Sequence, residues 1–192
     1  MVKSGPRDRV LIDALERLET ASFEGTVWRI TRDGRDPTLF YGGGNRWDDG
    51  TFDVLYTSFS KNGALAEMRF HLSRGQPLIP SKIKYRLHEL RIRVADVLDL
   101  TDPALLGEIG IDMGTFGRMP YLNREGEYEA CQMVAEAVHF LGSEDAGDPS
   151  AIRVPSARSS GVNLVLFSDY VEPDDVEHVK DHGIIDWSGT QE

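Results

Sequence analysis

Four short runs carry the strongest fold signal in this chain: WRIT (28–31), GGGNRW (42–47), DVLYTSFS (53–60) and ALAEMRFH (64–71). The first and third are rich in β-branched and aromatic residues, which favour strands. The second contains three consecutive glycines and predicts a loop. The fourth begins an apolar stripe at helical spacing, formed by Leu65, Met68 and Leu72. These runs therefore predict a strand, a loop, a strand and a helix in succession.

Periodic hydrophobic patterns extend this alternation in both directions along the chain. The predicted helices are 7–20, a helix starting at 61–63 with Asn62 as its cap, a short helix opened by Asp102-Pro103, and 125–141. The predicted strands are 25–30, 53–57, 90–94, 152–154 and 162–167, with 156–161 a hairpin or an active-site loop. Helices and strands are interspersed without a regular βαβ period, so the sequence predicts an α+β fold, a single domain of mixed sheets with flanking helices.

Composition limits the classes of function. The chain has 192 residues, 40% of them hydrophobic, and a formal net charge of −11. This charge opposes binding to nucleic acid or to anionic membranes, so an anionic ligand would need a local cluster of arginines. The single cysteine, Cys131, excludes an internal disulfide and a cysteine-rich zinc site, and the five histidines show no familiar metal motif. Without an apolar run for a signal peptide or a bilayer span, a cytoplasmic protein is expected.

Four side chains in the opening runs could hold an anionic ligand that contains a sugar, namely Arg29, Arg46, Tyr56 and Glu67. Arg29 lies between Trp28 and Ile30, where it is either solvated or a bidentate ligand for phosphate or ribose. Arg46 follows the glycines, which allow a backbone to approach a ligand closely. Glu67 lies roughly 130° from the apolar stripe of its helix, so it is either a surface carboxylate or a catalytic group under a neighbouring loop.

Tyr56 and Ser156 also have two interpretations. The Tyr56 ring either packs in the core or stacks on a planar heterocycle. Ser156, after Val154-Pro155, is either a turn residue or a hydrogen-bond partner for a ligand. No G-x-S-x-G motif surrounds Ser156, which argues against a serine hydrolase.

In combination, these segments resemble the RES domain family, the toxin components of bacterial Xre–RES toxin–antitoxin pairs. The matching segments are Trp28-Arg29-Ile30, Gly43-Gly44-Asn45-Arg46-Trp47, Val54-Leu55-Tyr56-Thr57-Ser58, Ala64-Leu65-Ala66-Glu67, the DLTD segment within 97–102, and Val154-Pro155-Ser156-Ala157. Two features depart from the family pattern: Asn45 splits the usual G-G-R-W run, and Asp48-Asp49 replaces the common Asn-Pro.

The resemblance implies an α+β core similar to that of ADP-ribosyltransferase toxins, and an enzyme that destroys NAD. It divides the chain into an N-terminal helical arm (1–24), a RES-like catalytic domain (25–170) and a C-terminal strand or tail packed on the same domain (171–192). If the roles of the family's residues are transferred to the matching positions, the catalytic residues are Glu67, Arg29 and Tyr56. The substrate-binding residues are then Arg46, Ser156 and Ser58. The arginines would grip the NAD phosphates, Tyr56 would pack on the nicotinamide-ribose end, and Glu67 would be the catalytic carboxylate.

Three functions remain open at this point. The first is cleavage of the nicotinamide-ribose bond by hydrolysis or phosphorolysis, in which one carboxylate stabilises an oxocarbenium-like sugar. The second is ADP-ribosyl transfer to a protein or small acceptor. The third is a non-catalytic binding module, which the departures at Asn45 and Asp48 favour. The resemblance also implies NAD as a substrate with no cofactor or metal, a homodimer, and an Xre-type antitoxin partner.

Overall fold

A computed structural model describes residues 8–73, 83–118, 125–142 and 149–187. The helices are α1 (Arg9–Leu15), α2 (Lys61–Ser73), α3 (Pro103–Glu108) and α4 (Glu125–Leu141). The strands are β1 (Thr20–Arg32), β2 (Val54–Ser58), β3 (Tyr85–Asp99), β4 (Ala151–Pro155), β5 (Val162–Phe167) and β6 (Val176–Ile184). The prediction of an α+β fold is confirmed.

The sheet is mixed and closes on itself. Its six strands have the order β1-β2-β5-β4-β3-β6, and β1 also pairs with β3. Trp28 of β1 pairs with Ser58 of β2 and with Glu89 of β3, so β2 and β3 lie on opposite edges of β1. Five strands therefore form a ring, and β6 extends it along β3. The β3–β4 pair is parallel, whereas the other pairs are antiparallel.

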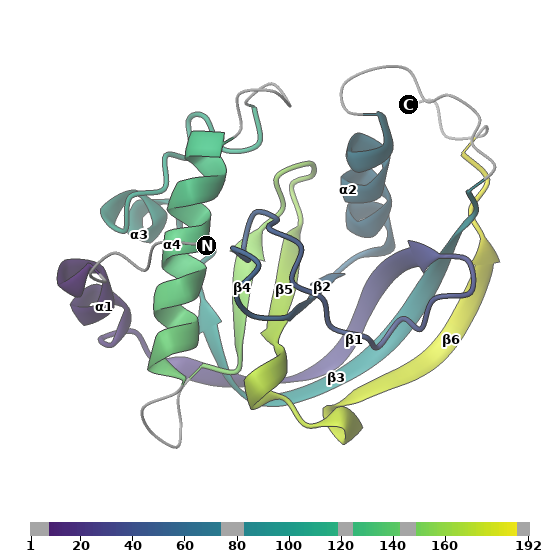
Figure 1. Cartoon of the computed structure of the whole chain (residues 1–192), viewed down its shortest axis with the longest axis horizontal. Helices are drawn as coiled ribbons and strands as arrows, with labels where there is room; N and C mark the ends of the chain where they lie inside the picture. The colour runs from purple at the N-terminus through teal and green to yellow at the C-terminus, as the bar shows by residue number, and fades with distance from the viewer. Residues whose placement is uncertain (1–7, 74–82, 119–124, 143–148, 188–192) are drawn as a thin grey trace.

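Helices α2 and α4 flank the short strands β2, β5 and β4, while β1, β3 and β6 form a long curved strip beneath them (Figure 1). The inner face of α4 is formed by five residues that are at most 7% exposed: Cys131, Val134, Ala135, Val138 and Leu141. They pack with residues of β2, β4 and β5 in the largest hydrophobic cluster. The stripe of α2 is half-buried and packs on a smaller cluster around Ile30 and Leu87.

Tertiary pairing changes several predicted boundaries. The bounds of α4 and the start of α3 after Asp102 are as predicted, but the expected helix over 7–20 ends at Leu15. The chain from Thr20 joins β1 instead, because its backbone pairs with the end of β3. The same pairing lengthens the strands predicted over 25–30 and 90–94. Residue 7 of the predicted first helix lies outside the described residues.

The predicted cap of α2 was wrong. The helix already begins at Lys61, and the Ser60 hydroxyl accepts a hydrogen bond from the Gly63 amide at 3.0 Å. A serine one residue before the helix satisfies a free N–H of the first turn, which Asn62 inside that turn cannot do.

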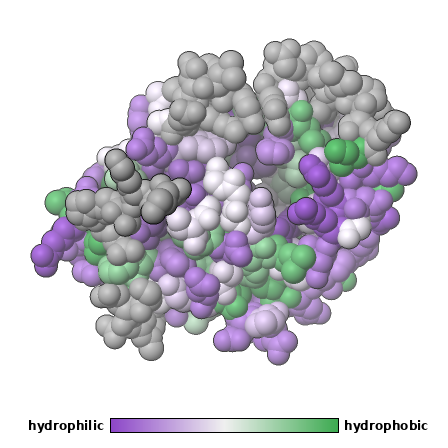
Figure 2. Space-filling model, viewed as in Figure 1, coloured by the Kyte–Doolittle hydropathy of each residue, from purple (hydrophilic) through white to green (hydrophobic). Residues whose placement is uncertain are grey.

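The surface is largely hydrophilic on the face shown in Figure 2, with a group of hydrophobic residues in its lower middle. This distribution agrees with the high charge of the chain. Within the described part of the chain, the helices are too short or too polar to cross a membrane.

Gly63 allows α2 to approach β2 closely. A Cβ atom at this position would collide with the hydroxyl of Ser58 and meet that of Ser60 at 3.0 Å. We expect Gly63→Ala to lower the free energy of unfolding by about 1–3 kcal/mol, the usual cost of overpacking. Gly107→Ala is the matched control, because a Cβ there meets nothing within 4 Å and α3 gains a better helix former. Chemical denaturation measures both, and an equal or higher stability of Gly63→Ala would contradict the close contact.

His88 is buried on β3 beside Arg29, its register partner on β1. Its ring contacts the Thr31 hydroxyl at 3.1 Å and the His178 ring at 3.2 Å. Burial lowers the pKa of His88, and the positive charges of His178, Arg86 and Arg29 lower it further against the opposing effect of Asp181.

A lowered pKa makes stability depend on pH in a defined direction. Above the ordinary histidine pKa of 6.5, His88 is neutral in both the folded and the unfolded chain, and protonation costs no stability. As the pH falls from 6.5 through the lower pKa of the folded state, the unfolded chain binds a proton more readily, and the folded protein loses stability. We expect His88→Gln, which keeps hydrogen-bonding capacity but cannot titrate, to lose less stability than wild type between about pH 7.5 and 5.5. Thermal unfolding across this range measures the difference, and parallel curves for the two proteins would refute it.

Candidate functional site

A cavity of about 310 Å³ lies among α2, α4, β1, β2, the 45–47 loop and the β4–β5 hairpin. This volume is at the lower end of small-molecule sites. Five of the six predicted site residues line it: Arg29, Arg46, Tyr56, Ser58 and Glu67. The sixth, Ser156, lies between the lining residues Pro155 and Ala157 and bonds directly to Glu67. Folding thus gathers all six around one cavity, although the sequence separates Arg29 from Ser156 widely.

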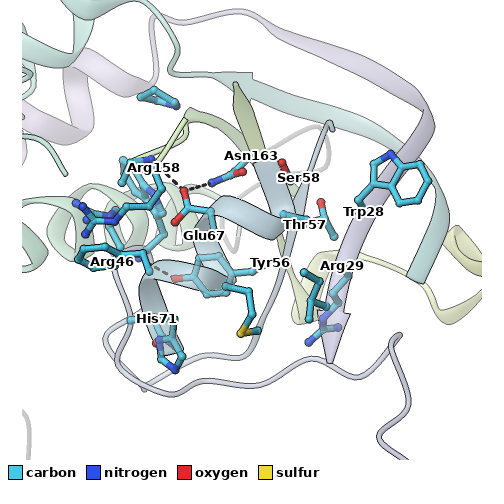
Figure 3. Close-up of a pocket in the computed structure, with 18 of the residues that line it drawn as sticks. Trp28, Arg29, Arg46, Tyr56, Thr57, Ser58, Glu67, His71, Arg158 and Asn163 are labelled. Atoms are coloured by element: carbon cyan, nitrogen blue, oxygen red, sulfur yellow. Dashed lines mark hydrogen bonds between the residues drawn. The ribbon is translucent and has the colours of Figure 1, made fainter. Parts of the chain in front are cut away.

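Glu67 lies near the centre of the close-up in Figure 3. Its Oε1 atom accepts hydrogen bonds from the Ser156 hydroxyl at 2.7 Å, the Ala157 amide at 3.0 Å and the Asn163 side chain at 3.2 Å. These donors come from the β4–β5 hairpin, whereas Glu67 comes from α2. The hairpin therefore covers the helix flank that carries Glu67, and three donors to one oxygen orient the carboxylate in the cavity.

Ser156 holds this arrangement together. It is 8% exposed, and its hydroxyl donates to Glu67 while it accepts from the amides of Arg158 and Ser159, both at 3.1 Å. The Ser156 amide donates to the Gly161 carbonyl at 2.9 Å, which closes the loop between β4 and β5. Ser156 is thus a turn residue, as one interpretation from sequence has it, and also a partner of Glu67, while its hydrogen bond to a ligand stays a prediction.

Arg29 connects the cavity to the loop that follows β1. Its Nη1 donates to the carbonyls of Pro37 at 2.7 Å and Leu39 at 2.8 Å. Burial lowers the pKa of Arg29 to about 10, and the charge of Asp36 opposes this shift only in part. The remaining N–H donors of a guanidinium lie on Nε and Nη2, so the group keeps the capacity to bind an anion. A half-buried cation whose charge is only partly compensated favours an anionic ligand.

Arg46 is 9% exposed and lies between two aromatic rings. Its Cζ atom is 4.6 Å from the ring centroid of Phe116 and 4.9 Å from that of Tyr128 on α4. Cation–π contacts of this kind favour a fixed guanidinium over a mobile one. Asn45, which splits the family's usual run, leaves Arg46 on the cavity wall.

Ser58 ends β2, where it is 3% exposed, and its hydroxyl lies 3.5 Å from the Val162 carbonyl. Tyr56, two residues earlier, presents its side chain to the cavity but uses its hydroxyl elsewhere. The hydroxyl donates to Asp48 Oδ2 at 3.0 Å and accepts from the Trp47 amide at 2.8 Å. Burial raises the pKa of Tyr56 well above its usual value, and the nearby Asp48 charge adds to the rise. The phenol is therefore neutral, so it supplies an aromatic surface and a structural hydrogen bond rather than a base.

Two cavity residues that bond to Ser156 or Glu67 were missed in the sequence: Arg158 and Asn163. The Arg158 guanidinium lies over the Phe70 ring and donates to the Gly117 carbonyl. The sequence could have indicated Arg158 as a site residue, because it follows the Pro-Ser segment by two residues. Nothing in the pattern of β5 indicates that Asn163 belongs to the site. In Figure 3, Arg46 and Arg158 lie on one side of Glu67 and Arg29 lies on the other.

The lining as a whole is cationic. Among the described residues it contains three arginine side chains and a single carboxylate, that of Glu67, in a chain whose net charge is −11. Because the net charge of the chain repels anions, an anionic ligand needs a local cluster of arginines, and this cavity provides one. Across the described ranges, no group of three or more His, Cys, Asp or Glu side chains is placed to hold a metal ion.

Comparisons with known proteins agree with this architecture. A search of curated proteins gave no match. Among solved structures, the chain is similar to one from a crystal structure of the M. tuberculosis MbcT–MbcA toxin–antitoxin complex. That match has a TM-score of 0.74 and 21% identity, and it covers 93% of each chain. The likeness shows a shared fold. The model of the RES domain matches residues 26–188, which is most of the sequence, and the chain therefore belongs to the RES domain family.

Proposed function

We propose that this protein is an NAD-degrading enzyme that breaks the bond between nicotinamide and ribose. The observation that carries the proposal is the Glu67 carboxylate, oriented by three hydrogen-bond donors in a cavity that three arginines line. A dinucleotide contains two phosphates for the arginines and a ribose whose reacting carbon develops positive charge. The site offers the matching charge for each part of such a molecule.

The reaction needs little from the protein beyond electrostatics. The C1′–N bond breaks and its electron pair leaves with nicotinamide, which is neutral once released. The ribose is left as an oxocarbenium-like cation, which the Glu67 carboxylate stabilises. Water or inorganic phosphate then adds to C1′, and water loses a proton in that step. A second carboxylate to protonate the leaving group is unnecessary, in agreement with the single carboxylate of the lining.

The other groups bind and orient the substrate in this proposal. Arg29 and Arg46 hold the phosphates, the Tyr56 ring packs against the nicotinamide end, and Ser58 contributes to the adjoining wall. Ser156 acts mainly through Glu67, because its hydroxyl is 2.7 Å from that carboxylate. Such fixed groups lower the barrier because little reorganisation accompanies the reaction.

The proposal includes a biological role as a toxin that an Xre-type antitoxin blocks. Membership of the RES family supports it, as does the similarity to a protein from the MbcT–MbcA toxin–antitoxin complex. Co-expression with the product of an adjacent Xre-like gene tests this role, since such a partner should restore growth and co-purify with the chain. Dimer formation stays a prediction that light scattering can test.

Glu67→Gln is the decisive test of the site. The amide oxygen can still accept hydrogen bonds, but the negative charge that stabilises the sugar cation is gone. We expect nicotinamide release from NAD to fall by about 10²–10³-fold, the usual cost of a lost electrostatic contact in a transition state. The control is Glu108→Gln on the exposed end of α3, which should behave as wild type.

The readout for Glu67→Gln is release of nicotinamide by purified protein, with circular dichroism to verify folding. A folded Glu67→Gln variant that releases nicotinamide at the wild-type rate would rule out Glu67 as the catalytic carboxylate. Absence of nicotinamide release from wild type itself, with NAD still bound, would favour the binding-module alternative.

NAD labelled in its adenylate half separates degradation from transfer. We expect the label to appear in free ADP-ribose, or in ADP-ribose 1-phosphate when inorganic phosphate is present. Chromatography distinguishes these two products and thereby identifies the acceptor. Label attached covalently to protein or to another small acceptor would instead establish an ADP-ribosyltransferase.

A further inference from the structure

Asp48 is a buried carboxylate beside the cavity. Its side chain is 0% exposed, and it is absent from the lining although Arg46 and Trp47 before it are both present. An isolated carboxylate in such a place carries a large desolvation cost unless hydrogen bonds compensate it. The contacts of Asp48 therefore indicate what this residue does.

Three donors converge on the two oxygens of Asp48. Oδ1 accepts from the Gly44 amide at 2.6 Å, and Oδ2 accepts from the Asn45 amide and the Tyr56 hydroxyl, both at 3.0 Å. Two of these donors belong to the turn that leads into Arg46, and the third belongs to β2. The carboxylate thus ties the turn to the sheet, with Gly44 at a φ of +67° that favours glycine.

Helix α4 holds the same turn from its other side. The Gln132 side chain donates to the carbonyl of Asn45 at 2.7 Å and to that of Asp48 at 3.1 Å. Arg46 leaves the turn between these fixed points, and its guanidinium lies between Phe116 and Tyr128. Asp48 and Gln132 together therefore restrain the backbone on both sides of Arg46.

We propose that Asp48 is a positioning residue that fixes Arg46 for the phosphates of the substrate, an inference that rests on the proposed function. A carboxylate is a pure acceptor and satisfies three converging donors, whereas an amide has one acceptor oxygen and a donor NH₂ group. The aspartate that departs from the family's common asparagine is therefore matched to its own surroundings. It supports Arg46 in the ligand site and does not mark the loss of that site.

Asp48→Asn tests this inference in the full-length chain, with Asp49→Asn as the matched control. The Asp49 carboxylate accepts from the Thr51 amide and hydroxyl and is outside the cavity lining. We expect Asp48→Asn to weaken the affinity for ADP-ribose by about tenfold, the effect of one lost hydrogen bond to a charged group. The affinity for nicotinamide, which lacks phosphates, should fall less than the affinity for ADP-ribose, and Asp49→Asn should match wild type for both ligands.

Hydrogen exchange gives a readout that does not require activity. The amides of Gly44 and Asn45 should exchange faster in Asp48→Asn and at the wild-type rate in Asp49→Asn. Gln132→Leu is the second variant if Asp48→Asn fails to fold. It removes the bonds from α4 and should weaken ADP-ribose binding in the same selective manner.

The outcomes separate this inference from the proposed function. Unchanged ADP-ribose affinity, equal weakening for nicotinamide, or no ADP-ribose binding by wild type would overturn the role of Asp48. Selective weakening would support it even if wild type released no nicotinamide from NAD, a result that would contradict only the proposed reaction.

Discussion

The candidate site depends on the contact between the Glu67 carboxylate and the β4–β5 hairpin. Ser156, Ala157 and Asn163 all donate to Oε1, so one oxygen connects α2 to the loop after β4 and to β5. The contact also fixes how the hairpin loop lies, because the Ser156 hydroxyl accepts the amides of Arg158 and Ser159. The same hydrogen bonds therefore hold the hairpin against α2 and orient the candidate catalytic carboxylate.

Electrostatics adds a second constraint. The chain is strongly acidic, so the field around it repels the anionic ligand that the site would bind. The protein meets this constraint locally, with Arg29, Arg46 and Arg158 around a carboxylate, Glu67, that is the single one in the lining among the described residues. Each guanidinium is held by carbonyls or by aromatic rings, both of which leave its charge intact. A fixed cationic wall can therefore coexist with an acidic surface.

Local patterns predicted the elements whose sequence signal is local. The bounds of α4, the Asp102 cap of α3, and the strands β2 and β5 were recognisable, because helical periodicity, capping chemistry and short apolar runs are visible without knowledge of the partner. The lengths of β1 and β3 were underestimated, since their outer residues are strands only because they pair with each other. The Ser60 cap was missed although its signal is local, since its hydroxyl accepts from the amide of Gly63, three residues later.

The sequence by itself determined the α+β class, the family and six of the residues around the cavity, because the order and spacing of short motifs are written in the chain. Only the tertiary structure decided how those residues act. It directs the Tyr56 hydroxyl to Asp48, uses Ser156 to orient Glu67, and adds Arg158 and Asn163 to the site. The physical reason is that hydrogen bonds and burial depend on partners far apart in sequence, whereas motifs reveal residue types and their spacing.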